Sequence, residues 1–284
     1  MRRRLSIAWF ALLAPLAAPQ QIWAQQRPLV TEDPETIGAG RVLVEGGIDY
    51  AHDQQYPVAG LKGNLRRTPT IGVSVGLSSI AELQIDGGLY DHLTITERRA
   101  APLASLVTFD GAMTDGVEDT IVATKIRVIP ETTRRPAFGI RFATKLPNAS
   151  NESGLGLDTT DFFASLLGAK TVQSVRFVGN AGVGILGDPT NGHRQNDVLT
   201  YGLSFARAVT QAAELVGELN GRVSTRRGDP FPGTESRGLL KLGGRYTRGP
   251  VRLDAAIYFG LTTVDPTIGF TVGATYVFDA FTIP

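Results

Sequence analysis

Apolar and polar residues alternate with a period of two along most of the chain after residue 40. Between residues 251 and 261, an apolar side chain stands at every second position, while Arg252 and Asp254 fall on the opposite face. Helical spacing would scatter these two charged residues among the apolar ones, whereas a β-strand separates the two sets. The pattern therefore predicts a strand with one apolar face and one polar face.

The same alternation predicts twelve strands in all. They cover residues 42–50, 70–77, 81–90, 119–128, 138–146, 158–169, 175–185, 199–206, 213–222, 240–246, 251–261 and 268–278. The alternation is weakest in the sixth segment, where Phe162–Phe163 and Leu166–Leu167 are doubled. A tilted strand of about 9–11 residues is long enough to cross a bilayer.

The connections between these strands alternate in length. Short ones are expected at 78–80, 130–135, 170–174, 208–211 and 247–250, and long ones at 51–67, 91–117, 147–158, 186–196 and 224–235. Only the link at 262–266 departs from this rule. Short turns at one end and long loops at the other are typical of outer-membrane barrels. We therefore expect an all-β protein, a single antiparallel up-and-down transmembrane β-barrel of about twelve strands.

The N-terminus has the layout of a secretory signal peptide. Three arginines at positions 2–4 precede an apolar run over residues 5–18, and Ala24 stands at a plausible cleavage position. An uncleaved membrane anchor is the alternative, but the apolar run is shorter than the ~20 residues of a helical span. We expect a signal peptide at 1–24, a periplasmic N-terminal segment at 25–40, an outer-membrane barrel at 41–278 and a C-terminal tail at 279–284.

Charge and cysteine content narrow the classes of function. The chain has 28 Lys and Arg against 27 Asp and Glu, and removing the leader takes away three bases and no acid, which leaves 25 against 27, a net charge of −2. This near-neutral balance gives no electrostatic reason to expect a nucleic-acid partner. The chain has no cysteine, so the exported protein must gain its stability without disulfides.

The polar faces of the predicted strands carry charges of both signs, and the apolar faces carry almost none. Closure into a barrel leaves no unpaired strand edge in lipid, where unsatisfied backbone groups are costly. A soluble β-sandwich or lipocalin-like barrel is the alternative, because periodicity alone does not tell inside from outside. In a membrane barrel the charged residues would line the lumen, and the candidates are Arg127, Arg141, Arg176, Glu214, Glu218, Arg222, Lys241, Arg245, Arg252 and Asp254.

Several short motifs carry a family resemblance. They are Thr31-Glu32-Asp33-Pro34 followed by Gly38-Ala39-Gly40, the hairpin Gly76–Leu83, Gly116–Asp119 leading to Lys125, and Lys145-Leu146-Pro147 with Gly154-Leu155-Gly156. In these motifs, over most of the mature chain, the sequence resembles the outer-membrane channel family named for the MetA pathway of phenol degradation. Glu118 and the pair at 148–149 depart from the family pattern. The resemblance implies a transporter-like barrel for hydrophobic or aromatic compounds.

The last predicted strand carries a second resemblance. Its residues Thr271, Gly273, Tyr276 and Phe278 resemble the C-terminal signal that the outer-membrane barrel assembly machinery reads. Six further residues, 279–284, follow the final aromatic residue, which is a departure from a terminal signal. The resemblance implies that the strand from Thr271 to Phe278 contacts this machinery.

Two motifs and three histidines could suggest catalysis. Residues 72–76 match G-x-S-x-G and residues 182–187 match G-x-G-x-x-G, but each motif needs a strand followed by a helix, and both lie within alternating strand patterns. His52, His92 and His193 are expected in or beside loops, without partners at metal-ligand spacing. We therefore expect no enzyme, no cofactor and no metal.

The expected function is an outer-membrane channel for small solutes, and the family resemblance implies hydrophobic or aromatic compounds. A non-conducting structural or surface-interaction barrel is the alternative, and an outer-membrane hydrolase is a third. Twelve strands lie between the ~8 that side chains fill and the ~16 that leave an aqueous channel. The predicted long loop at 91–117 contains Phe109 and could fold into the mouth as a constriction.

Overall fold

The computed structural model describes residues 27–282. The predicted signal peptide at 1–24 lies outside the described residues. Among the described residues, no helix is long and apolar enough to cross a membrane. Strands account for most of the chain, with a single 3-10 turn, η1 (Ala104–Leu106), in the described part.

The structure has fourteen strand segments. They are β1 (Arg41–Tyr56), β2 (Leu61–Gly76), β3 (Ala81–Gly88), β4 (Asp91–Arg98), β5 (Met113–Gly116), β6 (Ile121–Ile129), β7 (Ala137–Lys145), β8 (Asp161–Val172), β9 (Val175–Gly187), β10 (Gln195–Ala208), β11 (Ala213–Ser224), β12 (Arg237–Arg248), β13 (Val251–Gly260) and β14 (Ile268–Asp279).

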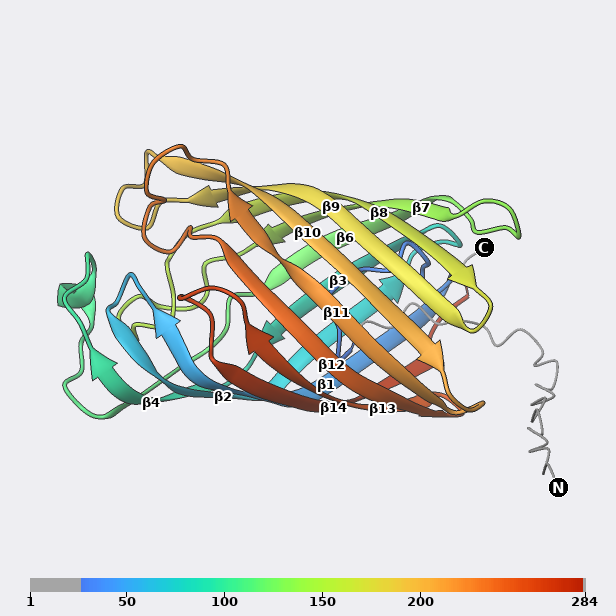
Figure 1. Ribbon diagram of the computed structural model, residues 1–284, viewed down its shortest axis with the longest axis horizontal. Helices are drawn as coiled ribbons and strands as arrows, with labels where there is room; N and C mark the ends of the chain where they lie inside the picture. The colour runs from blue at the N-terminus through green and yellow to red at the C-terminus, as the bar shows by residue number, and fades with distance from the viewer. Residues whose placement is uncertain (1–26, 283–284) are drawn as a thin grey trace, which may run out of the picture.

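These segments form a closed antiparallel barrel of twelve wall strands. β3 and β4 pair with successive stretches of β2, so together they make one wall strand, and β6 and β5 continue one another in the same way. β1 pairs with both β2 and β14, which closes the barrel. Figure 1 shows the tilted strands wrapping around a common axis. The predicted fold class and strand number are confirmed.

The apolar face of the strands points outward. In β13, exposed and buried positions alternate, so that Leu253 is 53% exposed while the neighbouring Asp254 is 6% exposed. The same outward face carries exposed leucine, valine, isoleucine and phenylalanine side chains on all sides of the barrel. A wide apolar exterior over a polar interior suits lipid rather than water. The soluble alternative, with its apolar face inward, is therefore wrong.

The two ends of the barrel differ as predicted, with corrections. β2–β3, β6–β7, β8–β9, β10–β11 and β12–β13 are joined by short turns at the end where β1 starts and β14 finishes. The predicted loops at 51–67 and 91–117 are largely wrong, because β1 and β2 extend to a turn at 57–60, and β4 and β5 leave only 99–112 as a loop. Alternation failed there because the outward residues of these extensions are polar. We call the short-turn side the inner half and the long-loop side the outer half.

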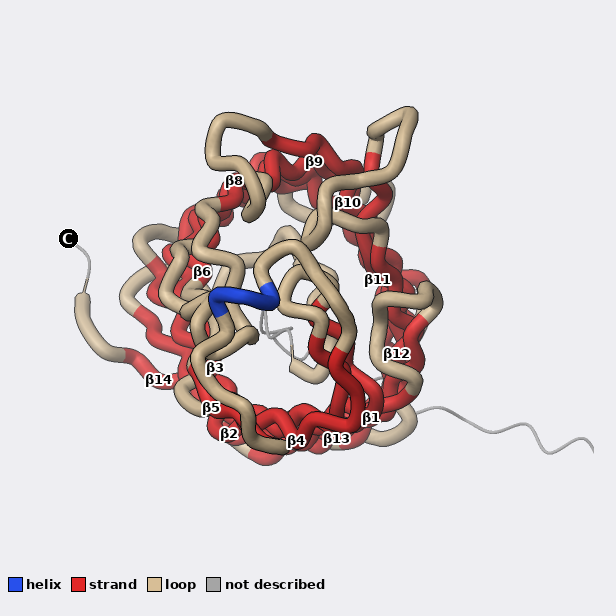
Figure 2. Tube along the Cα trace, turned by 90° about the vertical axis from the view of Figure 1, so that its left-hand side faces the viewer, coloured by secondary structure: helices blue, strands red, loops and turns tan. Residues whose placement is uncertain are grey.

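Residues 27–40 run inside the barrel. We expected this stretch to lie in the periplasm as part of the segment 25–40, and for the described residues that expectation is wrong. Its side chains and backbone bond to inward-facing groups of the wall from Thr70 to Thr271. We call residues 27–40 the N-terminal segment. At the other end, Figure 2 shows η1 and neighbouring loops lying across the opening.

Candidate functional site: the barrel lumen

The ten charged residues predicted to line the lumen lie on the inward face of the wall. Those near the middle are deeply buried, since Glu218 is 2% exposed and Asp254 6%. Pairs form within the wall, with Glu214 Oε2 at 3.9 Å from both Arg245 and Arg252. The structure thus places these residues around one interior. The acids among them are too few to pair with all of the bases.

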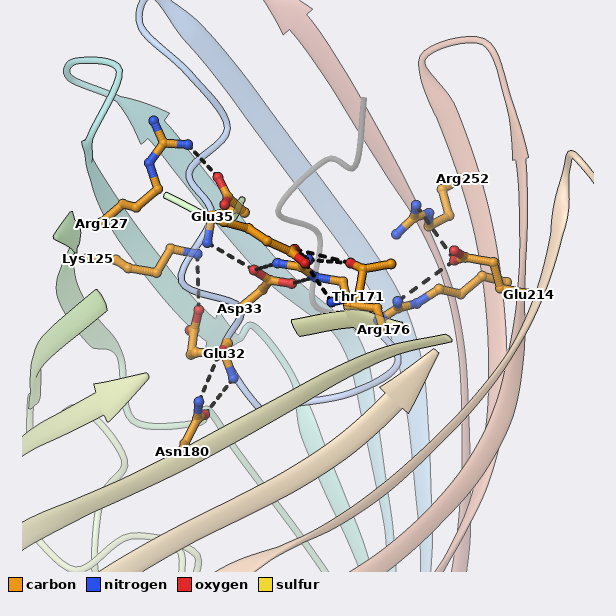
Figure 3. Close-up of polar contacts among 12 residues, drawn as sticks. Glu32, Asp33, Glu35, Lys125, Arg127, Thr171, Arg176, Asn180, Glu214 and Arg252 are labelled. Atoms are coloured by element: carbon orange, nitrogen blue, oxygen red, sulfur yellow. Dashed lines mark hydrogen bonds and ion pairs between the residues drawn. The ribbon is translucent and has the colours of Figure 1, made fainter. Parts of the chain in front are cut away.

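Acidic side chains of the N-terminal segment supply the missing partners. Figure 3 shows Glu32, Asp33 and Glu35 pointing in different directions toward basic residues of the wall. Asp33 forms a two-pronged ion pair with Arg176, and Glu35 pairs with Arg127. Charge-assisted pairs of this bidentate kind are among the stronger polar contacts in proteins. The segment is therefore attached to β6 and β9 by ion pairs.

Glu32 enters the deepest of these ion-pair groups. Its carboxylate lies 3.0 Å from Arg141 Nε and 3.4 Å from Lys125 Nζ, and Lys125 also lies 3.0 Å from Glu82. The side chains of Lys125 and Glu82 are fully buried. Removing one member of a buried ionic group leaves the others unpaired, which costs about 3–5 kcal/mol. This cluster joins the segment to β3, β6 and β7.

The backbone of the N-terminal segment is bonded to the wall as well. Glu218 accepts hydrogen bonds from the backbone N–H groups of Val30 and Thr31, and Asn180 both accepts from and donates to the backbone of Glu32. Lys241 donates to the Pro28 carbonyl over 2.7 Å. A buried strand-like segment without sheet partners needs such bonds, because unpaired backbone groups are costly.

Arg27 marks the inward end of the described segment. Its guanidinium donates to Thr70, Thr271 and the Val272 carbonyl, and its Nε lies 3.5 Å from Asp254. These wall partners belong to β2, β13 and β14. The segment therefore crosses the interior from this side of the barrel to β6 and β9, where Glu35 and Asp33 are paired.

The outer half of the lumen is filled differently. Leu61, Leu65, Leu93 and Tyr258 form a buried apolar cluster with two alanines, and Val107 and Phe109 of the 99–112 loop pack against it. Leu65 and Leu93 are fully buried. The loop is shorter than expected, its residues Val107 and Phe109 pack inside the barrel, and a constriction by it remains a prediction.

The barrel interior contains an inner and an outer cavity. The inner cavity, of about 310 Å³, is lined by Val30, Thr31 and Glu32 of the N-terminal segment together with β7–β12. The outer cavity, of about 280 Å³, lies under the turn at 57–60 and the loop at 146–160. Both are lined by Phe163, Arg222 and Arg237, so they adjoin at these three residues.

The two motifs considered for catalysis lie within barrel strands. Ser74 lies within the continuous strand β2, and residues 182–187 lie within β9, so neither stands at a strand-to-helix turn. The expectation that all three histidines lie in or beside loops is wrong for two of them, since His52 belongs to β1 and His92 to β4, where it lies 2.6 Å from Asp115. In the described part of the chain, no group of three or more acidic or histidine side chains could hold a metal ion.

Sequence reasoning missed the acidic residues of the N-terminal segment and the buried partners Glu82, Lys125 and Asn180. A signal for the first group was present, because the ten predicted lumen residues contain more bases than acids. Such an excess indicates that acids from outside the strands enter the lumen. Lys125 stood out in the sequence only as the end of the Gly116–Asp119 motif, because alternation does not distinguish it from the other polar positions of its strand.

The outward apolar face and the charged interior define this protein as a membrane-spanning β-barrel whose lumen holds the N-terminal segment. No family model matches the chain, and no curated protein matches it. Solved structures do match. The beta domain of the Bordetella autotransporter BrkA is 14% identical, over 84% of this chain and 99% of its own, with a TM-score of 0.47.

Two outer-membrane transport proteins are also similar. The outer membrane channel DcaP of Acinetobacter baumannii is 10% identical, over 84% of this chain and 96% of its own, with a TM-score of 0.43. The Pseudomonas putida toluene transporter TodX is 12% identical, over 88% of this chain and 92% of its own, with a TM-score of 0.39. At these values the likeness concerns the barrel, and function has to be argued from the residues of this chain.

Proposed function

We propose that this protein is an outer-membrane channel for small solutes, exported by its signal peptide, and that the structure is its closed state. The observation that carries the proposal is the pair of adjoining cavities, which lead from the outer loops to the N-terminal segment. A solute that enters from the outer end would meet the segment at Val30–Glu32. Movement of the segment would open the inner half.

The way the segment is held supports this proposal. Ion pairs and hydrogen bonds of Glu32, Asp33 and Glu35 hold the segment to the wall, and no strand of the sheet includes it. Near its end, Ile37 also packs against Leu43 and Val277. Replacing buried ion pairs by apolar groups is often neutral or stabilising, so a purely structural filling has no need of them.

The cavities favour small solutes with an apolar part. Volumes of about 310 and 280 Å³ lie near the lower end of the range of small-molecule sites. Phe163 lines both cavities, and Tyr56, Leu155 and Leu157 line the outer one. This lining supports hydrophobic or aromatic compounds, as the family resemblance implies.

Assembly is a separate part of the proposal. We propose that β14, with Thr271 to Phe278, is the strand that the barrel assembly machinery reads. β14 closes the barrel against β1, and its aromatic residues Tyr276 and Phe278 stack on the outward face with ring centroids 5.6 Å apart. A closing strand with an outward aromatic pair is suited to such a role.

Single-channel conductance in planar bilayers tests the channel. We expect rare openings of the wild-type protein and frequent openings of the double variant Asp33→Asn, Glu35→Gln, in which two ion pairs of the segment are lost. Asp229→Asn, in the exposed loop at 225–236, is the matched control and should behave like wild type. Absence of conductance in all three proteins, with no solute uptake into liposomes, would support the non-conducting structural or surface barrel instead.

A further inference from the structure

Two arginines face each other where the two cavities adjoin. Arg222 of β11 and Arg237 of β12 are register partners, so their Cα atoms lie directly opposite one another. Like charges at such positions destabilise a sheet. The arrangement therefore has a cost that a bound anion would relieve.

Neither arginine has a close carboxylate partner. Arg222 donates through Nε and Nη2 to the backbone carbonyls of Glu235 and Gly233, both over 2.9 Å, and it forms no ion pair with the residues that the structure describes. The nearest acid to Arg237 is Asp265, at 3.9 Å. The other oxygen of Asp265 accepts from the Gly238 and Thr262 N–H groups, which holds that carboxylate in its turn.

The surroundings combine positive charge with apolar surface. The charged residues lining the two cavities are Arg67, Arg141, Lys145, Arg222 and Arg237 against Glu32, Asp119 and Asp161. The three acids are paired, Glu32 with Arg141 and both aspartates with Lys145. Among the described residues, Arg222 thus has no ion-pair partner and Arg237 has only Asp265, at 3.9 Å. Both arginines line the cavities beside Phe163, and Leu157 lines the outer one.

We propose that Arg222 and Arg237 form a binding site for an organic carboxylate with an apolar body, such as an aryl or short alkyl acid. The guanidinium groups would bind the carboxylate by paired N–H donors, a geometry that matches both oxygens. The apolar body would lie against Phe163 and the leucines of the outer cavity. This proposal rests on the proposed channel and narrows its substrate class from small solutes to organic acids.

Titration calorimetry of the full-length protein in detergent tests the site, with benzoate as the probe. We expect saturable binding of benzoate and at least tenfold weaker binding of benzamide, which has the same shape without the charge. Inorganic phosphate should also bind at least tenfold more weakly, because it carries no apolar body. A phosphate affinity equal to that of benzoate would mean a general anion site and would overturn the proposal.

Variants separate the arginine pair from other effects. The double variant Arg222→Gln, Arg237→Gln should lose at least tenfold in benzoate affinity, and the double lysine variant should keep part of it. Arg227→Gln, which removes an exposed arginine from the nearby loop, should bind as wild type does. Heat-modifiable migration checks folding, and if the double variant does not fold, the single variant Arg237→Gln takes its place.

The outcomes of this test differ from those of the conductance test. Equal affinities for benzoate and benzamide, absent benzoate binding in wild type, or unchanged binding in the folded glutamine variant would overturn the carboxylate site. Benzoate binding that depends on the two arginines in a protein without conductance would keep the site and refute the channel. Conductance without benzoate binding would keep the channel and refute the carboxylate site.

Discussion

The two halves of the lumen are filled by opposite means. In the inner half, a separate stretch of chain is held by ion pairs of Glu32, Asp33 and Glu35 with the wall. In the outer half, Leu61, Leu65 and their neighbours form a buried apolar cluster, in which the Tyr258 hydroxyl donates to Asp49 Oδ1 and to the Tyr50 carbonyl. Ion pairs are directional, whereas apolar packing is not. Under the proposed channel function, this difference assigns the movable closure to the inner half and the rigid support to the outer half.

Loss of Lys125 should have the largest effect on stability. Lys125→Met leaves Glu32 and Glu82 buried without their shared cation, so we expect a loss of about 4 kcal/mol in the free energy of unfolding. Urea unfolding followed by far-ultraviolet circular dichroism in detergent measures it. Lys170→Met is the control, because Lys170 also pairs with an acid but is 30% exposed at the side chain, and it should cost under about 1 kcal/mol. Equal losses in both variants would contradict the buried cluster.

Truncation of the outer cluster should be the next largest effect. Leu65 is fully buried, and Leu65→Ala should cost about 3 kcal/mol through lost burial and a cavity. Leu253→Ala, on the lipid-facing side, is the matched control and should cost less. The salt dependence of channel opening should stay as in wild type. A changed salt dependence would mean that the two halves are not separate.

Release of one ion pair should change opening more than stability. Arg176→Gln removes the partner of Asp33 and part of the contact to Glu131, so we expect a stability loss of about 2 kcal/mol and more frequent openings. Arg194→Gln is the control, since Arg194 pairs with Asp188 over 2.8 Å in an outer turn. That control should leave opening unchanged, and an equal rise in both variants would refute the role of the segment.

The sequence predicts the wall well and its extensions poorly. Within the bilayer, outward residues such as Leu253 must be apolar and inward ones such as Asp254 are polar, so the period of two is clear. Beyond the bilayer the outward face meets water, and in β2 it is Leu61 and Leu65 that point inward. A bulge near Asp53, which has a positive φ of 60°, shifts the register as well. The extensions of β1 and β2 over residues 51–67 therefore lack the apolar alternation of a membrane strand, and the sequence predicted a loop there.

The candidate site was predictable only in part. The inward charges follow from the alternation, because each strand has two faces. The N-terminal segment has no period of its own, and its partners come from strands far apart along the chain, as with Glu32 and Arg141. The pair Arg222 and Arg237 depends on the register of β11 and β12, which alternation does not specify across a loop.

Acid should weaken the inner half slightly. Burial raises the pKa of the Glu131 carboxyl, but hydrogen bonds from the Thr171 backbone N–H, Lys170 and Arg176 outweigh burial and hold that pKa below its usual value. A lowered pKa in the folded state gives stability above the unfolded pKa that is lost as pH falls through the folded one. We expect wild type to lose more stability than Glu131→Gln below about pH 4.5. Parallel pH profiles of the two proteins would contradict this.

The most direct test of the closed lumen is a disulfide that fixes the N-terminal segment to the wall. Thr31 Cβ lies 3.3 Å from the position a Cβ would take at Gly202, close to the ~3.8 Å of natural disulfides, and the chain has no other cysteine. In the variant Thr31→Cys, Gly202→Cys, we predict no bilayer conductance when oxidised and wild-type openings after reduction, with Thr31→Cys alone insensitive to both. Equal conductance of the oxidised and reduced double variant would contradict closure by the segment.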